Sequence, residues 1–284
     1  MTQTVISKDG TSIAYQMVGA GQPLLLVDGA LCHRGFGPSG KLAAALAPSF
    51  TVITYDRRGR GESGETQPYA VEREVEDIEA LIAEVGGSAY AYGISSGAAL
   101  ALEAANRLTG ITKLALYEAP FIVDDTHPAR PADYLARMDG LIAADRRGDA
   151  LKVFMKTAGA PAIAVTMMRL TPAWKKLKAV AHTLPYDFRV LGDTGSGSPL
   201  PAQRWGAVTM PVLVAAGGES PAWMANAMRA LADLLPGAQH RTLQGQTHLV
   251  KAQAIAPVLV EFFDGPAGVV PNNASQSTTS ERTA

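Results

Sequence analysis

The chain has 284 residues, a formal net charge of −1 at pH 7 and a single cysteine, Cys32. This length suits one large domain, with or without an inserted segment. Because the net charge is near zero and no block of Lys or Arg occurs, we expect neither nucleic acid nor a membrane as a partner. A single cysteine excludes an intrachain disulfide and fits a reducing compartment.

The N-terminus, Met1-Thr2-Gln3-Thr4, has neither a basic stretch nor a long apolar run, so we expect no signal peptide. No stretch approaches the ~20 uninterrupted apolar residues that a membrane span needs. These features predict a cytoplasmic protein.

Strand and helix patterns alternate over the first 120 residues. Apolar runs and turn signals predict strands at 5–6, 12–18, 23–27, 50–55, 89–92 and 112–117. Helical spacing of apolar residues predicts helices over 42–46 and 71–85, and an alanine-rich helix after residue 97. The acidic residues of 71–85 fit a solvated helix face rather than a metal site. This alternation predicts a parallel sheet wound on both faces.

The strand pattern stops between residues 121 and 208. Helices are expected there over 131–147, 149–156, 161–169 and 172–183, followed by a flexible segment at 192–198. Strands then return at 211–216 and 239–243, with one helix capped by Ser220 and a closing helix over 250–263. We therefore expect a core (1–120 and 209–264), an inserted helical cap (121–208) and a disordered tail (265–284).

The clearest chemical motif is Gly93-Ile94-Ser95-Ser96-Gly97, between a predicted strand and a predicted helix. So tight a turn forces the serine into a strained backbone conformation and leaves no room for a side chain at either glycine. The serine is thereby presented at the end of the sheet, facing the positive N-terminus of the helix. This context indicates a nucleophile, whereas the motif alone would indicate only a glycine-rich turn.

Other polar residues also follow predicted strands: Asp28-Gly29-Ala30, Glu118, Glu219 and His248. The carboxyl ends of parallel strands meet at one edge of a sheet, where sites usually form. We therefore expect these residues to gather near Ser95.

The chain resembles the α/β-hydrolase fold family over about residues 1–264. The resemblance rests on the motif at 93–97, on a late Gly245-Gln246-Thr247-His248, and on Asp-Arg-Arg-Gly-Arg-Gly-Glu-Ser at 56–63, which is similar to the family's Asp-x-Arg-Gly-x-Gly-x-Ser. It implies a mostly parallel, doubly wound sheet of the α/β-hydrolase type, with 121–208 as an inserted helical cap.

The resemblance also implies roles for the residues at that edge. Ser95 would attack an acyl carbon after His248 takes its proton, because an unassisted hydroxyl is too weakly acidic. The oxyanion would be stabilised by the backbone N–H groups of Ser96 and Ala30. The family usually has His-Gly where this chain has Asp28-Gly29. Asp28 would therefore either brace the loop or add a carboxylate near the site.

Two glutamates compete for the place of the triad acid. The family usually carries it after the seventh strand, nine residues beyond a proline such as Pro211, and that register falls on Ser220, one residue past Glu219. Glu118 follows the preceding strand, a placement similar to that in haloalkane dehalogenases. Either carboxylate could hold the imidazole in the right tautomer. We favour Glu118.

Further candidates lie in the loop at 56–63 and in the cap. Arg57, Arg58 and Arg60 could bind an anion, but a salt-bridged loop is the simpler interpretation. An apolar substrate pocket could be lined by Asp28, Leu31, Met167, Met168 and Trp174. The cap residues among them fit the cap's own core equally well.

We therefore expect a serine hydrolase that needs no cofactor or metal and cleaves a small to medium apolar ester or related acyl compound through an acyl-enzyme on Ser95. Its partner would be a small-molecule substrate, and a homodimer is left open. Two alternatives stand beside this one. Because of Asp28, the chain could instead be a lyase, a cyclase or a cofactor-free oxygenase. Because Glu219 lies one residue from the position expected for the triad acid, the chain could also be a ligand-binding protein with a vestigial triad.

Overall fold

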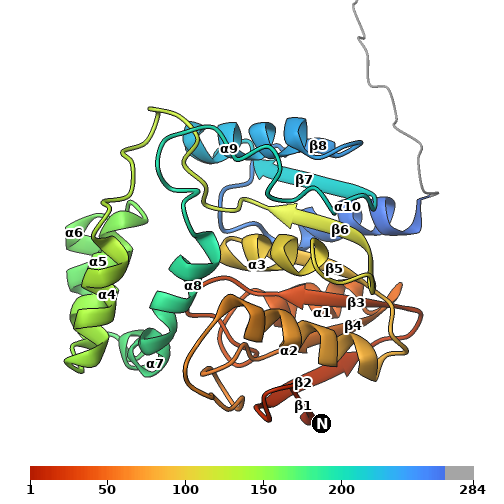
Figure 1. Cartoon of the computed structure of the whole chain (residues 1–284), viewed down its shortest axis with the longest axis horizontal. Helices are drawn as coiled ribbons and strands as arrows, with labels where there is room; N and C mark the ends of the chain where they lie inside the picture. Colours follow the sequence, from red (N-terminus) through yellow and green to blue (C-terminus); the bar gives the residue numbers. More distant parts are fainter. Residues whose placement is uncertain (266–284) are drawn as a thin grey trace, which may run out of the picture.

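The computed structural model describes residues 1–265, and an eight-stranded sheet lies at the centre of that part of the chain (Figure 1). The strand order is β1-β2-β4-β3-β5-β6-β7-β8, antiparallel at β1/β2 and β2/β4 and parallel elsewhere. The strands are β1 (Gln3–Ile6), β2 (Ser12–Val18), β3 (Gln22–Val27), β4 (Phe50–Tyr55), β5 (Ala89–Ile94), β6 (Ile111–Tyr117), β7 (Val212–Gly217) and β8 (Gln239–Leu243). The predicted α/β class with a mostly parallel sheet is confirmed.

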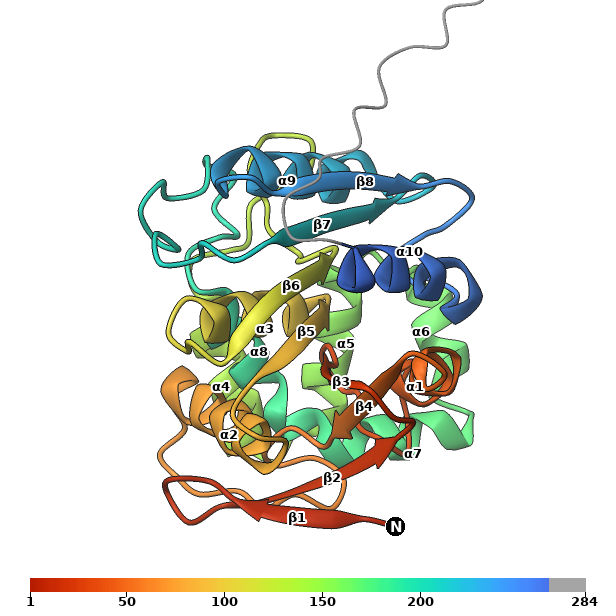
Figure 2. The same cartoon turned by 90° about the vertical axis from the view of Figure 1, so that its right-hand side faces the viewer.

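Helices cover both faces of the sheet, as the alternating pattern predicts. Helices α1 (Ser39–Leu46) and α10 (Ala252–Asp264) lie on one face, and α2 (Val71–Glu84) and α3 (Ser96–Ala105) on the other (Figure 2). Strand β3 shows why an uninterrupted apolar run is needed at the centre. Leu25 packs with the core on the α2/α3 side, and Leu24 with the core on the α1/α10 side. Each such side chain contributes roughly 1.5–3 kcal/mol by burial.

Helix α9 (Ala222–Leu234) begins later than the sequence predicts. The N-cap position is Pro221 rather than Ser220, and no side chain caps the helix. Pro221 has an extended ψ of 144°, so the helical turn starts only after it. The serine N-cap assigned from the sequence is therefore wrong.

Between β6 and β7 the chain forms a run of helices. These are α4 (Tyr134–Ala143), α5 (Arg147–Thr157), α6 (Ala162–Met168), α7 (Pro172–Val180), the 3₁₀ helix η1 (Ala181–Thr183) and α8 (Leu184–Leu191). Figure 1 shows α8 between α3 and the group α4–α7. The helices predicted for this region end at residue 183, so α8 is not among them. Its Pro185 stands in the first helical turn, where proline is accepted.

The described residues leave two expectations untested. Apart from Gly265, the predicted tail (265–284) lies outside them. Treating 121–208 as a separate cap also stays a prediction, although α4–α8 all fall within it. Within residues 1–265, every helix is too short or too polar to cross a membrane.

Candidate active site

Ser95 occupies a strained turn between β5 and α3. Its backbone has φ 59° and ψ −132°, in the positive-φ region that side-chain-bearing residues rarely adopt. A side chain at Gly93 would overlap the backbone of α3, and one at Gly97 would overlap carbonyls at the end of β3. The predicted strand–turn–helix context of Ser95 is therefore present, with its half-buried side chain at the carboxyl edge of the sheet.

Glu118 and His248 meet at this edge. Glu118 directly follows β6, has φ 46° and is fully buried. Its Oε1 accepts a hydrogen bond from the Gly217 N–H at 2.7 Å, and its Oε2 lies 2.9 Å from Nδ1 of His248. The His248 side chain is 32% exposed, so the pair joins a buried carboxylate to an accessible imidazole. A carboxylate in this position orients the ring and stabilises its charged form.

Glu219 lies in a different environment. It is exposed in the loop that follows β7, where its backbone N–H donates to the Gln246 carbonyl at 2.9 Å. The carboxylate that contacts His248 is therefore that of Glu118.

The loop after β3 runs against the serine. A Cβ atom placed on Gly29 would lie 2.9 Å from the Ser95 Cβ and 3.4 Å from its Oγ, so only glycine allows this approach. Ala30 follows Gly29 and is half-buried. Ser96 is the first residue of α3, where backbone N–H groups have no partner inside the helix. Both predicted oxyanion donors thus come from segments that border Ser95.

Asp28 is buried and binds to the start of α1. Its Oδ2 accepts a hydrogen bond from the Ser39 hydroxyl. Burial raises the pKa of Asp28 to about 6, against the opposing effects of Ser39 and two nearby arginines. Asp28, Ser39 and Tyr92 line a cavity of about 20 Å³, which is the size of a water molecule. Of the two roles considered for Asp28, this geometry favours bracing the loop.

The other predicted pocket residues do not line this cavity. Leu31 is buried, and Met168 and Trp174 pack against the large hydrophobic cluster that contains residues of the sheet and of α4, α5 and α8. Met167 is 61% exposed on α6. Met168 and Trp174 therefore take part in this packing, and a substrate pocket built from these residues stays a prediction.

The three arginines of the loop at 56–63 are each 1% exposed and paired with carboxylates. Their partners are Glu74 and Asp187 for Arg57, Asp77 and Asp9 for Arg58, and Asp187 for Arg60. The salt-bridged interpretation of this loop is confirmed. The sequence interpretation of α2 is partly wrong, since Glu74 and Asp77 are buried against these arginines rather than solvated.

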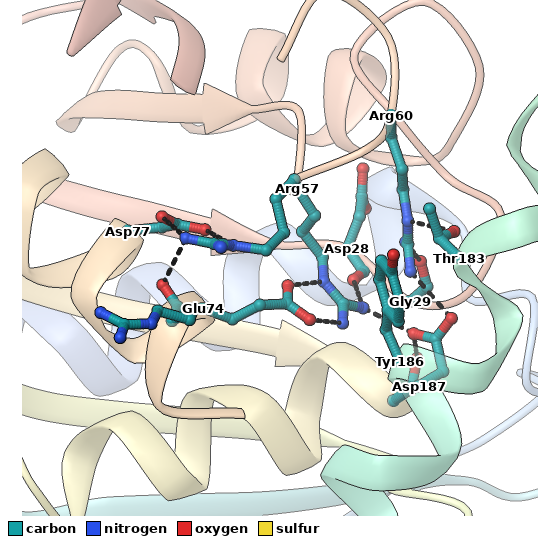
Figure 3. A network of polar contacts seen from close by, with 12 residues as sticks. Asp28, Gly29, Arg57, Arg60, Glu74, Asp77, Thr183, Tyr186 and Asp187 are labelled. Carbon is teal, nitrogen blue, oxygen red and sulfur yellow. Dashed lines mark hydrogen bonds and ion pairs between the residues drawn. The ribbon is translucent and has the colours of Figure 1, made fainter. Parts of the chain in front are cut away.

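Asp187, on α8, is the residue that sequence reasoning missed. It contacts Arg57 and Arg60 (Figure 3). It also accepts a hydrogen bond from the Ser96 hydroxyl. Burial alone would raise the pKa of Asp187, but the two arginines outweigh burial and hold it below its usual value. No spacing signal identifies Asp187, because its partners are about 90 to 130 residues away along the chain.

Within residues 1–265, His, Cys, Asp and Glu side chains do not cluster in threes as a metal site would require. The polar groups that the structure places at the carboxyl edge of the sheet are the Ser95 hydroxyl, the His248–Glu118 pair and backbone amides. That set can support acid–base and nucleophilic chemistry.

Comparison with known proteins gives a consistent result. The sequence pattern of the Alpha/beta hydrolase family matches residues 24–254. An alpha/beta hydrolase structure from Sphaerobacter thermophilus is 51% identical, with a TM-score of 0.84 over 92% of this chain and 100% of that chain. A hydrolase structure from Pseudomonas aeruginosa is 22% identical, with a TM-score of 0.69 over 92% of this chain and 98% of that chain. At that identity the likeness shows the fold alone.

Curated relatives match over a shorter region. An uncharacterized hydrolase of Bacillus subtilis, YraK, is 39% identical over 101 residues, which are 33% of this chain and 35% of the relative. The chain thus spans about a third of the length of the curated relatives that it matches. The family pattern, by contrast, covers most of the chain, including every motif at the sheet edge. The chain belongs to the alpha/beta hydrolase family.

Proposed function

We propose that this chain is a cofactor-free serine hydrolase that cleaves a small to medium apolar ester, or a related acyl compound, through an acyl-enzyme on Ser95. The observation that carries the proposal is the pair of His248 Nδ1 and the buried Glu118 carboxylate, 2.9 Å apart at the sheet edge where Ser95 is presented. Family membership supports hydrolase activity in general.

In the acylation step, His248 takes the proton of the Ser95 hydroxyl as the serine oxygen attacks the ester carbonyl carbon. Glu118 accepts the Nδ1–H hydrogen bond and stabilises the imidazolium that forms. The N–H groups of Ser96 and Ala30 donate to the negative carbonyl oxygen. The imidazolium then gives its proton to the departing alcohol as the ester C–O bond breaks, which leaves the acyl group on Ser95.

In the second step a water molecule takes the place of the alcohol. His248 removes a proton from the water as its oxygen attacks the acyl carbon, and then returns the proton to Ser95 as the serine leaves. The sum of the two steps is ester plus water to acid plus alcohol, with the chain unchanged. Apart from the water that is consumed, the chain's own side chains and backbone supply every group that these two steps need.

The test is hydrolysis of p-nitrophenyl esters from acetate to octanoate by the wild type and by Ser95→Ala. We expect Ser95→Ala to lower kcat by about 10³-fold or more. A fluorophosphonate probe should label the wild type and leave Ser95→Ala unlabelled. Circular dichroism checks that both proteins are folded. Equal rates for the two proteins at every chain length would contradict the proposal.

The same experiment separates the alternatives. A folded wild type that resists the probe and the esters would point to a lyase, a cyclase, a cofactor-free oxygenase or a ligand-binding protein. We do not propose these alternatives. Asp28 is the residue that suggested a non-hydrolytic reaction, and its hydrogen bond from Ser39 favours a bracing role instead. The contact between Glu118 and His248 likewise supports a working triad rather than a vestigial one.

A further inference from the structure

A cluster of four buried charges contacts the loop that follows β3: Arg57, Arg60, Glu74 and Asp187 (Figure 3). Each of these side chains is at most 2% exposed. Arg57 makes two hydrogen bonds to Glu74, at 2.6 and 2.7 Å, and one to Asp187 at 2.7 Å. Arg60 donates to Asp187 at 2.8 Å. Buried ion pairs add little net stability after desolvation, so stability alone does not account for the cluster.

The two arginines also donate to carbonyl groups of the loop. Arg60 Nη1 lies 2.7 Å from the Gly29 oxygen, and Arg57 Nη1 lies 3.3 Å from the Asp28 oxygen. A peptide unit is planar and trans, so its C=O and its N–H point in opposite directions. The bond from Arg60 to the Gly29 carbonyl therefore directs the Ala30 N–H away from the cluster and fixes its orientation.

Asp187 connects this loop with the other oxyanion donor. The Ser96 hydroxyl donates to Asp187 Oδ1 at 2.8 Å, and Ser96 is the residue whose backbone N–H begins α3. One carboxylate therefore contacts both arginines of the cluster and the residue after Ser95. Asp187 is thus linked to both predicted donors, to Ser96 directly and to Ala30 through Arg60 and the Gly29 carbonyl.

Arg60 depends on the helical insertion more than Arg57 does. Its side-chain partners within residues 1–265 are Thr183, at 3.0 Å, and Asp187, and both lie between β6 and β7. Arg57 would keep Glu74 if α8 moved, whereas Arg60 would be left with backbone carbonyls alone. An unpaired buried charge is costly, so Arg60 would leave its position together with α8.

We propose that Asp187 is a positioning residue that holds both oxyanion donors from α8. It pairs with Arg60, which orients the Ala30 N–H through the Gly29 carbonyl, and it accepts the hydrogen bond of the Ser96 hydroxyl at the start of α3. This inference rests on the proposed serine hydrolase function and adds a positioning residue to that site.

Arg58 supplies the matched control. It stands beside Arg57 in the same loop, is equally buried, and pairs with Asp77 through bonds of 2.8 and 2.7 Å. Its remaining bonds go to Asp9 and to the Arg73 carbonyl, none of which belongs to the loop after β3 or to α8. Asp77→Asn thus breaks a buried ion pair of the same kind without touching the oxyanion donors.

The experiment compares Asp187→Asn with Asp77→Asn in ester hydrolysis and in inhibition by an alkyl boronic acid. The boronic acid forms a tetrahedral adduct with the serine and so reports on the oxyanion donors. We expect Asp187→Asn to lower kcat by about 10- to 100-fold, which is less than the loss of a whole donor, with KM changed less than about 3-fold. Boronate affinity should fall by a similar factor, and Asp77→Asn should change kcat less than about 2-fold.

Two further variants keep the test decisive if Asp187→Asn does not fold. Ser96→Ala retains the backbone N–H but loses the bond to Asp187, and we expect it to lower kcat by about 3- to 10-fold. Arg60→Lys keeps the charge but cannot hold a carbonyl, a hydroxyl and a carboxylate in one plane. We expect it to behave like Asp187→Asn.

Equal kcat losses in Asp187→Asn and Asp77→Asn would overturn the inference, as would a kcat loss without weaker boronate binding. A wild type no faster than Ser95→Ala is a different outcome, because it would reject the proposed function itself. Melting temperatures of all variants, measured by circular dichroism, confirm that each assay is run on folded protein.

Discussion

The ends of β6 and β7 show how differently two glutamates can be placed after neighbouring strands. Glu118 follows β6, is fully buried and contacts both His248 and the Gly217 N–H. Glu219 stands two residues after β7 and is exposed. The end of β7 thus contributes a backbone hydrogen-bond donor to the carboxylate that follows β6.

The difference lies in the backbone rather than in the residue type. Glu118 has φ 46°, a conformation that costs free energy in a residue with a side chain and persists only where the surroundings impose it. That conformation directs the carboxylate into the interior, where it accepts a hydrogen bond from the Gly217 N–H. The chain after β7 turns instead toward α9, which leaves Glu219 at the surface.

Exchanging each glutamate for glutamine tests this comparison with the largest expected effect. Glu118→Gln removes the charge that stabilises the His248 imidazolium and can present an amide donor to Nδ1. We expect kcat for p-nitrophenyl butyrate to fall by about 10³- to 10⁴-fold. Glu219→Gln should retain kcat within about 2-fold, as exposed substitutions usually do.

Melting temperatures of the two variants provide the control, because only a folded Glu118→Gln protein tests the chemistry. A large kcat loss in Glu219→Gln with an active Glu118→Gln would reverse the assignment of the acid.

Much of this edge could be predicted from the sequence, because local patterns encode it. The apolar run of β3 and the glycines around Ser95 each specify a local geometry that the structure shows. The position of His248 after the last strand places it at the same edge. These features depend on neighbours in sequence or on sheet topology.

The rest depends on partners that are distant in sequence. Asp187 looks like an ordinary helical residue until α8 places it against two arginines more than 120 residues earlier. Glu74 resembles the solvated residues around it on α2 until Arg57 faces it. Which charged residues become buried is decided by tertiary pairing, and single-sequence periodicity contains no information about it.

Asp28, directly after β3, is a second buried carboxylate at this edge of the sheet, and its hydrogen-bond partners differ from those of Glu118. Its carboxylate accepts from Ser39, and burial raises its pKa from 3.8 to about 6. The folded state therefore binds the proton more tightly than the unfolded chain. The stabilising contribution of this group is present below about pH 4 and is lost as the pH rises through about 6.

Asp28→Asn should consequently stabilise the protein in a pH-dependent way. We expect its free energy of unfolding in urea to exceed that of the wild type by about 3 kcal/mol at pH 8, and to differ little at pH 4. A difference of the same size at both pH values would show that packing, rather than the buried charge, is responsible.

The smallest expected effect concerns how the end of β6 holds the histidine loop. The Tyr117 hydroxyl donates to the Thr247 carbonyl at 2.7 Å, directly before His248. Tyr117→Phe leaves that carbonyl without its partner, so we expect a loss of about 1 kcal/mol in stability and a fall of about 2- to 5-fold in kcat. Tyr92, on the neighbouring strand β5, is the matched control. It is also buried, and its hydroxyl makes no hydrogen bond to another residue within residues 1–265.

Tyr92→Phe breaks no bond to another residue, so it should change stability and kcat less than Tyr117→Phe does. The two variants delete the same atom from adjacent strands, and urea unfolding and ester hydrolysis measure both. If they behave alike, the Tyr117 bond does not position the loop, and the end of β6 acts on His248 through Glu118 alone. If only Tyr117→Phe loses rate, β6 fixes the histidine loop at two points, one on the ring and one on its backbone.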